Sequence, residues 1–127
     1  MVVNKAISQY QQVGVESALA NATPHRLIQM LYEGLLSNLS SLRGAMKNQQ
    51  YEMASVYIKK SSNILMGLEE GLDFEKGGEI ATNLLNLYDY MQRELINIQV
   101  SADEEHIDRL ITLVQEIKSA WDAIEEK

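Results

Sequence analysis

The sequence predicts an all-α protein that folds as an antiparallel, up-down four-helix bundle preceded by an N-terminal arm or short helix. In four separate segments, apolar residues recur every three or four positions, which is the period of a helix with one buried face. The single proline lies where the first of these segments begins, and no run of alternating β-branched residues indicates a strand. The connections are short, and four helices joined in this way pack most simply as an up-down bundle.

The length and composition indicate one soluble domain. The chain has 127 residues, which is enough for one hydrophobic core, so we expect an arm over residues 1–23 and a bundle over residues 24–127. Cysteine is absent, which excludes disulfides and thiolate metal sites. No apolar run approaches the roughly 18 residues that span a bilayer, and the N-terminus lacks the pattern of a signal peptide. A cytosolic protein without membrane insertion is therefore expected.

The first 23 residues contain scattered apolar side chains without a sustained helical period, and we interpret them as the arm. The first helix should begin at Thr23-Pro24, because threonine caps free amide groups and proline is tolerated at the first helical position. It should continue to about Lys47. Its apolar face covers about half of the circumference and comprises Leu27, Ile28, Leu31, Leu35, Leu39, Leu42 and Met46, widened by Tyr32 and Leu36.

A second helix is expected from about Tyr51 to Glu70 or Gly71, after a short polar break in the sequence. It is shorter than the first predicted helix but has the same apolar repeat. Its apolar positions are Met53, Ala54, Tyr57, Ile58, Ile64, Leu65, Leu68 and Leu72.

A loop over residues 71–78 should separate the second helix from a long third helix. We interpret the paired glycines Gly77 and Gly78 as a tight turn that sets the direction of this third helix. Its apolar positions are Ile80, Leu84, Leu87, Tyr88, Met91, Leu95 and Ile98. The pattern from Ser101 to Glu104 is typical of a capping box and should begin the fourth helix, whose apolar positions are Ile107, Leu110, Val114, Ile117, Trp121 and Ile124.

Charge and histidine spacing argue against two classes of function. The formal charge is -7, which disfavours nucleic acid as a partner because phosphate binding needs clustered lysines and arginines. A di-iron bundle needs two Glu-x-x-His pairs, but neither His25 nor His106 follows a glutamate by three positions. We interpret His25 as a surface residue and His106 as part of an acidic, solvated turn. No metal, cofactor or catalytic residue is expected.

More apolar side chains are present than one core face of each helix requires. Leu85 and Ile96 lie well away from the apolar face of the third helix, and the other helices carry similarly displaced residues, which are Met30, Leu36, Val56 and Met66. These residues could form a broad core edge with ordinary exposed apolar side chains. Alternatively, they could line grooves that accept an amphipathic segment of a partner, with methionines adapting to it.

The motifs of this chain resemble those of FliS, the family of flagellin-specific export chaperones of bacteria. The strongest resemblance lies in the middle of the chain, in Leu72-Asp73, Glu75-Lys-Gly-Gly-Glu-Ile-Ala81, Asn83-Leu84 and Leu87-Tyr-Asp-Tyr-Met91. The family's arm, first helix and last helix are matched by Tyr10, Val13-Gly-Val-Glu-Ser17, Thr23-Pro-His25, Leu27-Ile-Gln-Met-Leu-Tyr-Glu-Gly34 and Ala120-Trp121. The resemblance covers essentially the whole chain in order. One departure is Gly14, where a polar residue is common.

This resemblance implies a cytosolic, non-enzymatic chaperone that binds the disordered C-terminal segment of flagellin and prevents its premature polymerisation. It also implies delivery of flagellin to the export gate of the flagellar type III secretion system. The bound segment is expected to wrap the bundle, partly as helices in its grooves. The arm is expected to cover part of the apolar surface when flagellin is absent and to help docking at the gate, which carries over to Ile7 and Tyr10.

The expected partner-binding residues combine the arm with apolar positions in and beside the matched motifs. They are Ile7, Tyr10, Val13, Val15, Leu31, Leu36, Ile80, Leu84, Leu85, Leu87, Tyr88 and Ile96. Some of those on the third helix could instead belong only to the core. The alternative function is a generic helical-bundle adaptor, and a metal-containing bundle enzyme is much less favoured.

Overall fold

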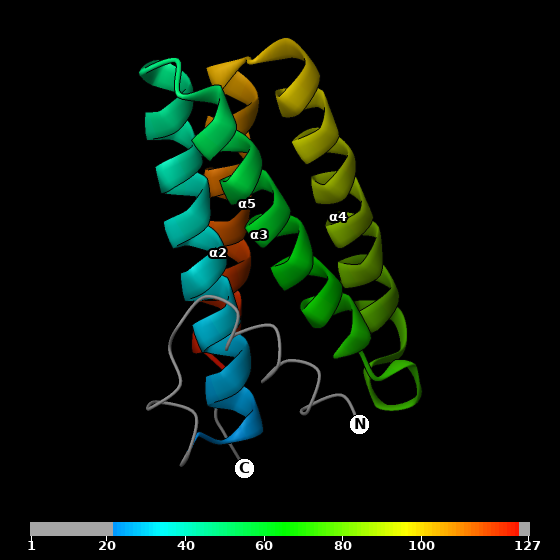
Figure 1. Ribbon diagram of the computed structural model, residues 1–127. Coiled ribbons are helices and arrows are strands. Elements are labelled where there is room, and N and C mark those ends of the chain that lie inside the picture. The colour runs from blue at the N-terminus through cyan, green and yellow to red at the C-terminus, as the bar shows by residue number, and fades with distance from the viewer. Residues whose placement is uncertain (1–21, 125–127) are drawn as a thin grey trace.

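The structure is a computed structural model that describes residues 22–124. These residues form the helices α2 (Pro24–Lys47), α3 (Tyr51–Glu70), α4 (Phe74–Ser101) and α5 (Glu104–Asp122), and they contain no strand. Successive helices run in opposite directions, with each connection at an end of the bundle (Figure 1). The predicted all-α, up-down bundle is confirmed. Most of the predicted arm, residues 1–21, lies outside the described residues.

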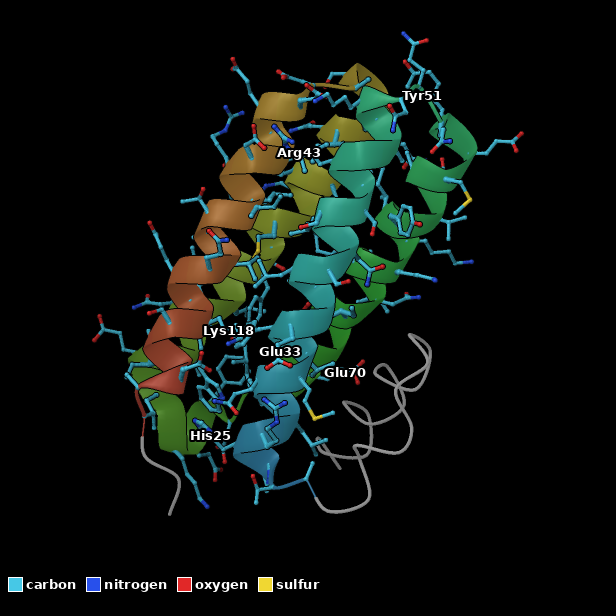
Figure 2. The ribbon with its side chains drawn as sticks, turned by 90° about the vertical axis from the view of Figure 1, so that its left-hand side faces the viewer. His25, Glu33, Arg43, Tyr51, Glu70 and Lys118 are labelled. Atoms are coloured by element: carbon cyan, nitrogen blue, oxygen red, sulfur yellow. The ribbon has the colours of Figure 1, made fainter. Side chains whose placement is uncertain are left out.

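The helices pack in a ring in which α2 has the most extensive contacts. It packs against α3 and α5, whereas α4 closes the ring through smaller interfaces with α3 and α5. His25 lies at the end of the bundle where α2 begins, and Tyr51 lies at the opposite end, where α3 begins (Figure 2). None of the helices in residues 22–124 has the length and apolar character needed to cross a membrane.

The predicted start of the first helix is confirmed. The hydroxyl of Thr23 accepts a hydrogen bond from the amide of Arg26 at 3.1 Å, and Pro24 occupies the first helical turn. This side-chain bond satisfies one of the amides that a helix leaves free at its N-terminus. The observed ends of α2 and α3 also match the predicted boundaries.

The predicted loop over residues 71–78 is shorter than expected. The carboxylate of Asp73 accepts hydrogen bonds from the amides of Glu75 at 3.1 Å and Lys76 at 3.0 Å, and it thereby caps a helical turn that begins at Phe74. Gly78 then interrupts the helix with φ 48° and ψ -122°. Residues with a side chain rarely adopt this positive φ, which explains why a glycine occupies this position. The predicted turn role is therefore confirmed for Gly78, but the helix begins before it.

The predicted capping box at the start of the last helix is wrong. Ser101 is still the last residue of α4, and its hydroxyl donates to the carbonyl of Asn97 at 2.8 Å. Ala102, with φ 56°, then reverses the chain. The cap of α5 is Asp103, whose carboxylate accepts from the amide of Glu105 at 2.9 Å.

The core largely follows the predicted apolar periods, with informative exceptions. Ile80 is 71% exposed, whereas its neighbour Ala81 is buried. The reason is that Ala81 lies on the same face of α4 as the buried Tyr88, and successive residues of a helix point about 100° apart. Met30, which the sequence placed away from the apolar face, is buried. The predicted apolar positions that are instead exposed on the second and fourth helices are Met53 and Ile124.

Candidate functional site

Two hollows on the bundle are candidate binding surfaces. The first, which we call the end cavity, has a volume of about 250 Å³ and lies at the end of the bundle where α2 begins. Side chains from all four helices surround it. Its apolar walls come from Ile28, Leu68, Leu72, Ile80, Leu84 and Trp121.

A pair of tyrosines also lines the end cavity. The hydroxyl oxygens of Tyr32 on α2 and Tyr88 on α4 lie 2.6 Å apart, and both side chains are almost completely buried. Burial raises the pKa of each phenol above its ordinary value, because the ionised form would lose its hydration. Both hydroxyls are therefore protonated at neutral pH, and their contact joins α2 to α4, two helices whose backbones do not approach each other closely.

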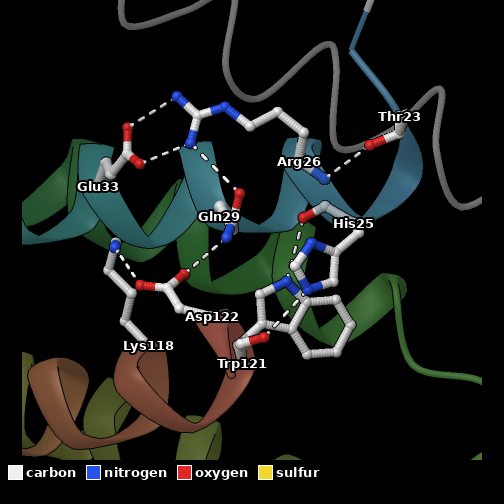
Figure 3. Close-up of polar contacts among 8 residues, drawn as sticks. All are labelled: Thr23, His25, Arg26, Gln29, Glu33, Lys118, Trp121 and Asp122. Carbon is white, nitrogen blue, oxygen red and sulfur yellow. Dashed lines mark hydrogen bonds and ion pairs between the residues drawn. The ribbon is translucent and has the colours of Figure 1, made fainter. Parts of the chain in front are cut away.

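The α5 side of the end cavity is held to α2 by His25 and Trp121 (Figure 3). The two rings stack with centroids 4.8 Å apart and planes 14° from parallel. The indole Nε1 of Trp121 donates to the carbonyl of His25 at 3.1 Å, and His25 Nε2 lies 3.0 Å from the carbonyl of Trp121. The interpretation of His25 as a surface residue is therefore wrong, because it is half-buried in this junction.

A polar cluster beside this junction adds a second link between the same helices (Figure 3). The side-chain amide of Gln29 on α2 donates to the carboxylate of Asp122 at 2.8 Å, and Lys118 donates to the same carboxylate at 2.6 Å. The hydrogen bond from Lys118 is the main reason that the pKa of Asp122 is lowered. On α2, Arg26 pairs with Glu33 at 2.8 Å.

The second hollow, which we call the α4–α5 groove, has a volume of about 640 Å³ and is open to solvent. Its apolar residues are Leu87 and Tyr90 from α4 and Leu113 from α5, and its polar residues are Asp108, Arg109, Thr112 and Glu116 from α5. Apolar walls with charged residues beside them are typical of a groove that accepts an amphipathic segment.

His106 lies at the junction between α4 and α5, and not in a freely solvated turn as the sequence suggested. Its Nδ1 is 2.6 Å from a carboxylate oxygen of Glu94 on α4 and 2.7 Å from Nη2 of Arg109. The carboxylate of Asp103 is 3.5 Å from the other ring nitrogen, so the expected acidic surroundings are present. The side chain of His106 is only 24% exposed. Among the described residues, no group of three or more acidic and histidine side chains could hold a metal ion.

The end cavity is built largely from residues of the FliS-like motifs, and comparison with known proteins identifies the family. Residues 6–127 match the family model of the flagellar protein FliS. The chain belongs to the FliS family. The resemblance stated from the sequence motifs is therefore confirmed.

Curated members of the FliS family are similar to this chain over nearly its whole length. The flagellar secretion chaperone FliSB of Pseudomonas aeruginosa is 44% identical over 124 residues, which cover 98% of each chain. The flagellar secretion chaperone FliS of Salmonella typhimurium is 41% identical over 128 residues, covering 100% of this chain and 95% of the relative. The Vibrio cholerae protein of the same name is 34% identical, with 94% of this chain and 88% of the relative covered.

The predicted partner-binding residues occupy different environments in this FliS-family structure. Leu31 and Tyr88 are almost completely buried in the core, although Tyr88 also lines the end cavity. Those in the arm, Ile7, Tyr10, Val13 and Val15, lie outside the described residues.

The remaining predicted residues are at least partly accessible, and the structure brings only some of them together. Ile80 and Leu84 meet Tyr88 around the end cavity, while Leu87 lies in the α4–α5 groove. Leu36 and Leu85 are half-buried and Ile96 is 61% exposed, and these three line neither hollow.

Several residues around the two hollows were not predicted as partner-binding. Tyr32 and Trp121 were assigned only to the core faces of their helices, although both line the end cavity. Tyr90, which belongs to the matched family motif, and Leu113 line the α4–α5 groove. The family motifs provided a signal for Tyr32, Tyr90 and Trp121, whereas Leu113 lies beside the apolar period of its helix and carries no separate signal.

Proposed function

We propose that this protein is a cytosolic export chaperone that binds the disordered C-terminal segment of flagellin. Binding keeps flagellin from polymerising prematurely and allows its delivery to the export gate of the flagellar type III secretion system. The observation that supports this function most strongly is the near full-length similarity to proteins named flagellar secretion chaperones. The protein acts by binding a polypeptide, without catalysis or a cofactor.

The accessible apolar surface of the bundle supports a disordered partner. A disordered segment loses conformational entropy when it folds on binding, so it needs a large, preformed apolar surface. The α4–α5 groove offers Leu87, Tyr90 and Leu113, and α4 also exposes Ile96 and Val100 to solvent by 61% and 83%. Flagellin's segment binds as an amphipathic helix in this groove and continues along α4.

The N-terminal arm covers part of this apolar surface in the free protein, through Ile7, Tyr10, Val13 and Val15. The start of the described chain supports this arrangement, because Ala22 is half-buried and packs against the core. Covering an apolar hollow protects it from aggregation until the partner arrives. Ile7 and Tyr10 also contribute to docking at the export gate.

Titration with the C-terminal segment of flagellin tests the proposed function. We expect wild-type protein to bind at micromolar concentration and Leu113→Glu to bind at least about tenfold more weakly, because a charge in the groove removes apolar contact worth about 1–2 kcal/mol. Val56→Glu is the matched control, since Val56 is exposed on α3 and lines neither hollow. Its affinity should remain within about twofold of wild type.

Failure of the wild-type protein to bind the segment at micromolar concentration would contradict flagellin binding and favour a general adaptor. Equal losses in the two glutamate variants would instead contradict binding in the α4–α5 groove. Delivery is tested separately by pull-down of the export gate's cytosolic domain with the chaperone–flagellin complex. Replacing Ile7 and Tyr10 by alanine should reduce this capture, and unchanged capture would argue against a docking role for the arm.

A further inference from the structure

The Tyr32–Tyr88 pair provides one more hydroxyl proton than residues 22–124 accept. Each phenol has one donor, and the single contact between the two oxygens, at 2.6 Å, uses only one of the two protons. Both phenols stay protonated because burial raises the pKa of each. Among the residues that the structure describes, no other hydrogen bond reaches either oxygen. One buried donor is therefore available to a bound molecule.

The end cavity lies beside this donor and has the size of a small organic molecule. Its volume is about 250 Å³, whereas an engineered apolar cavity of roughly 150 Å³ in another protein binds benzene. In the same proportion, the end cavity admits about ten non-hydrogen atoms. Because Ile28, Leu84 and Trp121 are among its walls, the part of the molecule that fills it is apolar, such as a benzene ring with a short substituent.

The polar part of such a molecule is an uncharged oxygen that only accepts. A hydroxyl or an amide would bring a further proton, for which the apolar walls offer no partner. A carboxylate would lose its hydration inside the cavity, and the exposed carboxylate of Asp73 at the rim would repel it. The carbonyl oxygen of a ketone, an aldehyde or an ester meets both conditions.

Protein side chains meet these conditions poorly. The oxygens of aspartate and glutamate are charged at neutral pH, and those of asparagine and glutamine belong to amides that also donate. The hydroxyls of serine, threonine and tyrosine donate as well. The chemistry of the end cavity therefore favours a free small molecule over a side chain of a protein partner.

We propose that the end cavity is a binding site for a small, neutral carbonyl compound with an apolar body, whose oxygen accepts the remaining proton of the Tyr32–Tyr88 pair. The site shares no lining residue with the α4–α5 groove, so it is separate from the surface assigned to flagellin. A molecule of the same shape without the oxygen leaves the buried donor unpaired and binds more weakly than its apolar surface alone would allow.

NMR titration of the full chain with acetophenone and α-methylstyrene tests this site. The two probes have nearly the same shape, but a CH₂ group replaces the carbonyl oxygen in α-methylstyrene. Acetophenone should bind the wild-type protein with a Kd of about 1 mM or lower. In Tyr32→Phe/Tyr88→Phe, the ratio of the two Kd values should change at least about tenfold in favour of α-methylstyrene, because no donor remains for the oxygen. Comparing ratios removes the difference in hydration between the two probes.

Tyr51→Phe/Tyr90→Phe is the matched control, because it removes two phenolic oxygens from exposed residues that do not line the end cavity. Its ratio of Kd values should stay within about twofold of wild type. An unchanged ratio in Tyr32→Phe/Tyr88→Phe, or an equal change in the two double variants, would overturn the proposed hydrogen bond.

The wild-type protein alone provides a second test should Tyr32→Phe/Tyr88→Phe fail to fold. Nuclear Overhauser contacts are expected between the methyl protons of acetophenone and the rings of Tyr32 or Tyr88. No binding at millimolar acetophenone, or contacts only at other residues, would overturn the site. These measurements are made without flagellin, so their outcome is separate from the titration that tests flagellin binding.

The source of the occupant is tested by adding the C-terminal segment of flagellin at saturating concentration. A segment bound in the α4–α5 groove should leave the Kd of acetophenone within about twofold, because the two sites have no residue in common. Displacement of acetophenone would instead assign the cavity to a side chain of flagellin and would overturn the proposal of a free molecule.

Discussion

The neighbouring serines of α3, Ser61 and Ser62, should respond to alanine substitution with opposite changes in stability. Ser61 is completely buried, and its hydroxyl has no hydrogen-bond partner among the described residues. Ser62 is half-buried, and its hydroxyl donates to the side-chain oxygen of Gln92 on α4 at 2.7 Å. The side-chain amide of Gln92 donates back to the carbonyl of Ser62 at 3.0 Å. Only the second serine therefore links two helices through its side chain.

The expected magnitudes follow from these two environments. Both substitutions gain a few tenths of a kcal/mol, up to about 0.5 kcal/mol, from the higher helix propensity of alanine. Ser61→Ala also removes a desolvated, unpaired hydroxyl, and its free energy of unfolding should rise by about 1–2 kcal/mol in total. Ser62→Ala loses a hydrogen bond and leaves the oxygen of Gln92 without its donor, so its free energy of unfolding should fall by about 1 kcal/mol.

Urea unfolding followed by far-ultraviolet circular dichroism measures both changes. Each serine serves as the control for the other, because the two substitutions remove the same atom from adjacent positions of one helix. The dependence of the unfolding free energy on urea should be the same for both variants, since the buried surface hardly changes. A destabilised Ser61→Ala variant, or equal changes in the two variants, would refute the assignment of an unpaired hydroxyl to Ser61 and an interhelical bond to Ser62.

Further substitutions test three local features of the bundle by the same unfolding assay. Gly78→Ala should lower the free energy of unfolding by about 1–2 kcal/mol, because Gly78 has φ 48°. Gly44 lies within α2 with open space around an added carbon, so Gly44→Ala should raise the free energy of unfolding by about 0.5–1 kcal/mol. Equal changes in the two variants would contradict the break in α4. Asp103→Ala should lower the free energy of unfolding by about 1 kcal/mol, because it removes the N-terminal cap of α5. A larger decrease for Ser101→Ala would instead support a capping box that begins at Ser101. The pKa of Asp122 is lowered chiefly by the hydrogen bond from Lys118. The difference in unfolding free energy between wild type and Asp122→Asn should therefore be largest above the ordinary carboxyl pKa, and it should disappear as the pH falls through the lowered pKa of Asp122. A difference that grows in acid would contradict this pH dependence.

The sequence predicted a helix boundary accurately where a single capping residue lay near that boundary. Thr23-Pro24 is a cap followed by a proline, and the helix begins there. At the last helix, two cap-forming residues, Ser101 and Asp103, lie two positions apart. Which of them caps α5 depends on where α4 ends, and the left-handed conformation of Ala102 decides this. Similarly, the motif containing Gly78 signalled a turn, but Asp73 begins a helical turn before it.

The environment of each apolar side chain was less predictable, because it depends on which helix lies opposite. Ile80 fits the apolar period of its helix as well as several core residues do, yet the smaller Ala81 is the one that is buried. Met30 lies away from the predicted face but is buried in the broad interface of α2. A repeat in the sequence gives the direction of a side chain around its own helix, but it does not give the position of the neighbouring helices.

The sequence by itself determined the all-α class, the number and approximate limits of the helices in residues 22–124, and the family. These properties follow from local periodicity, capping residues and contiguous motifs. Only the tertiary structure decided that Tyr32 and Tyr88 share a hydrogen bond across 56 positions and that His25 packs on Trp121 across 96 positions. Such contacts depend on the register and separation of packed helices, which no short segment contains. The end cavity exists for the same reason, since all four helices contribute to its walls.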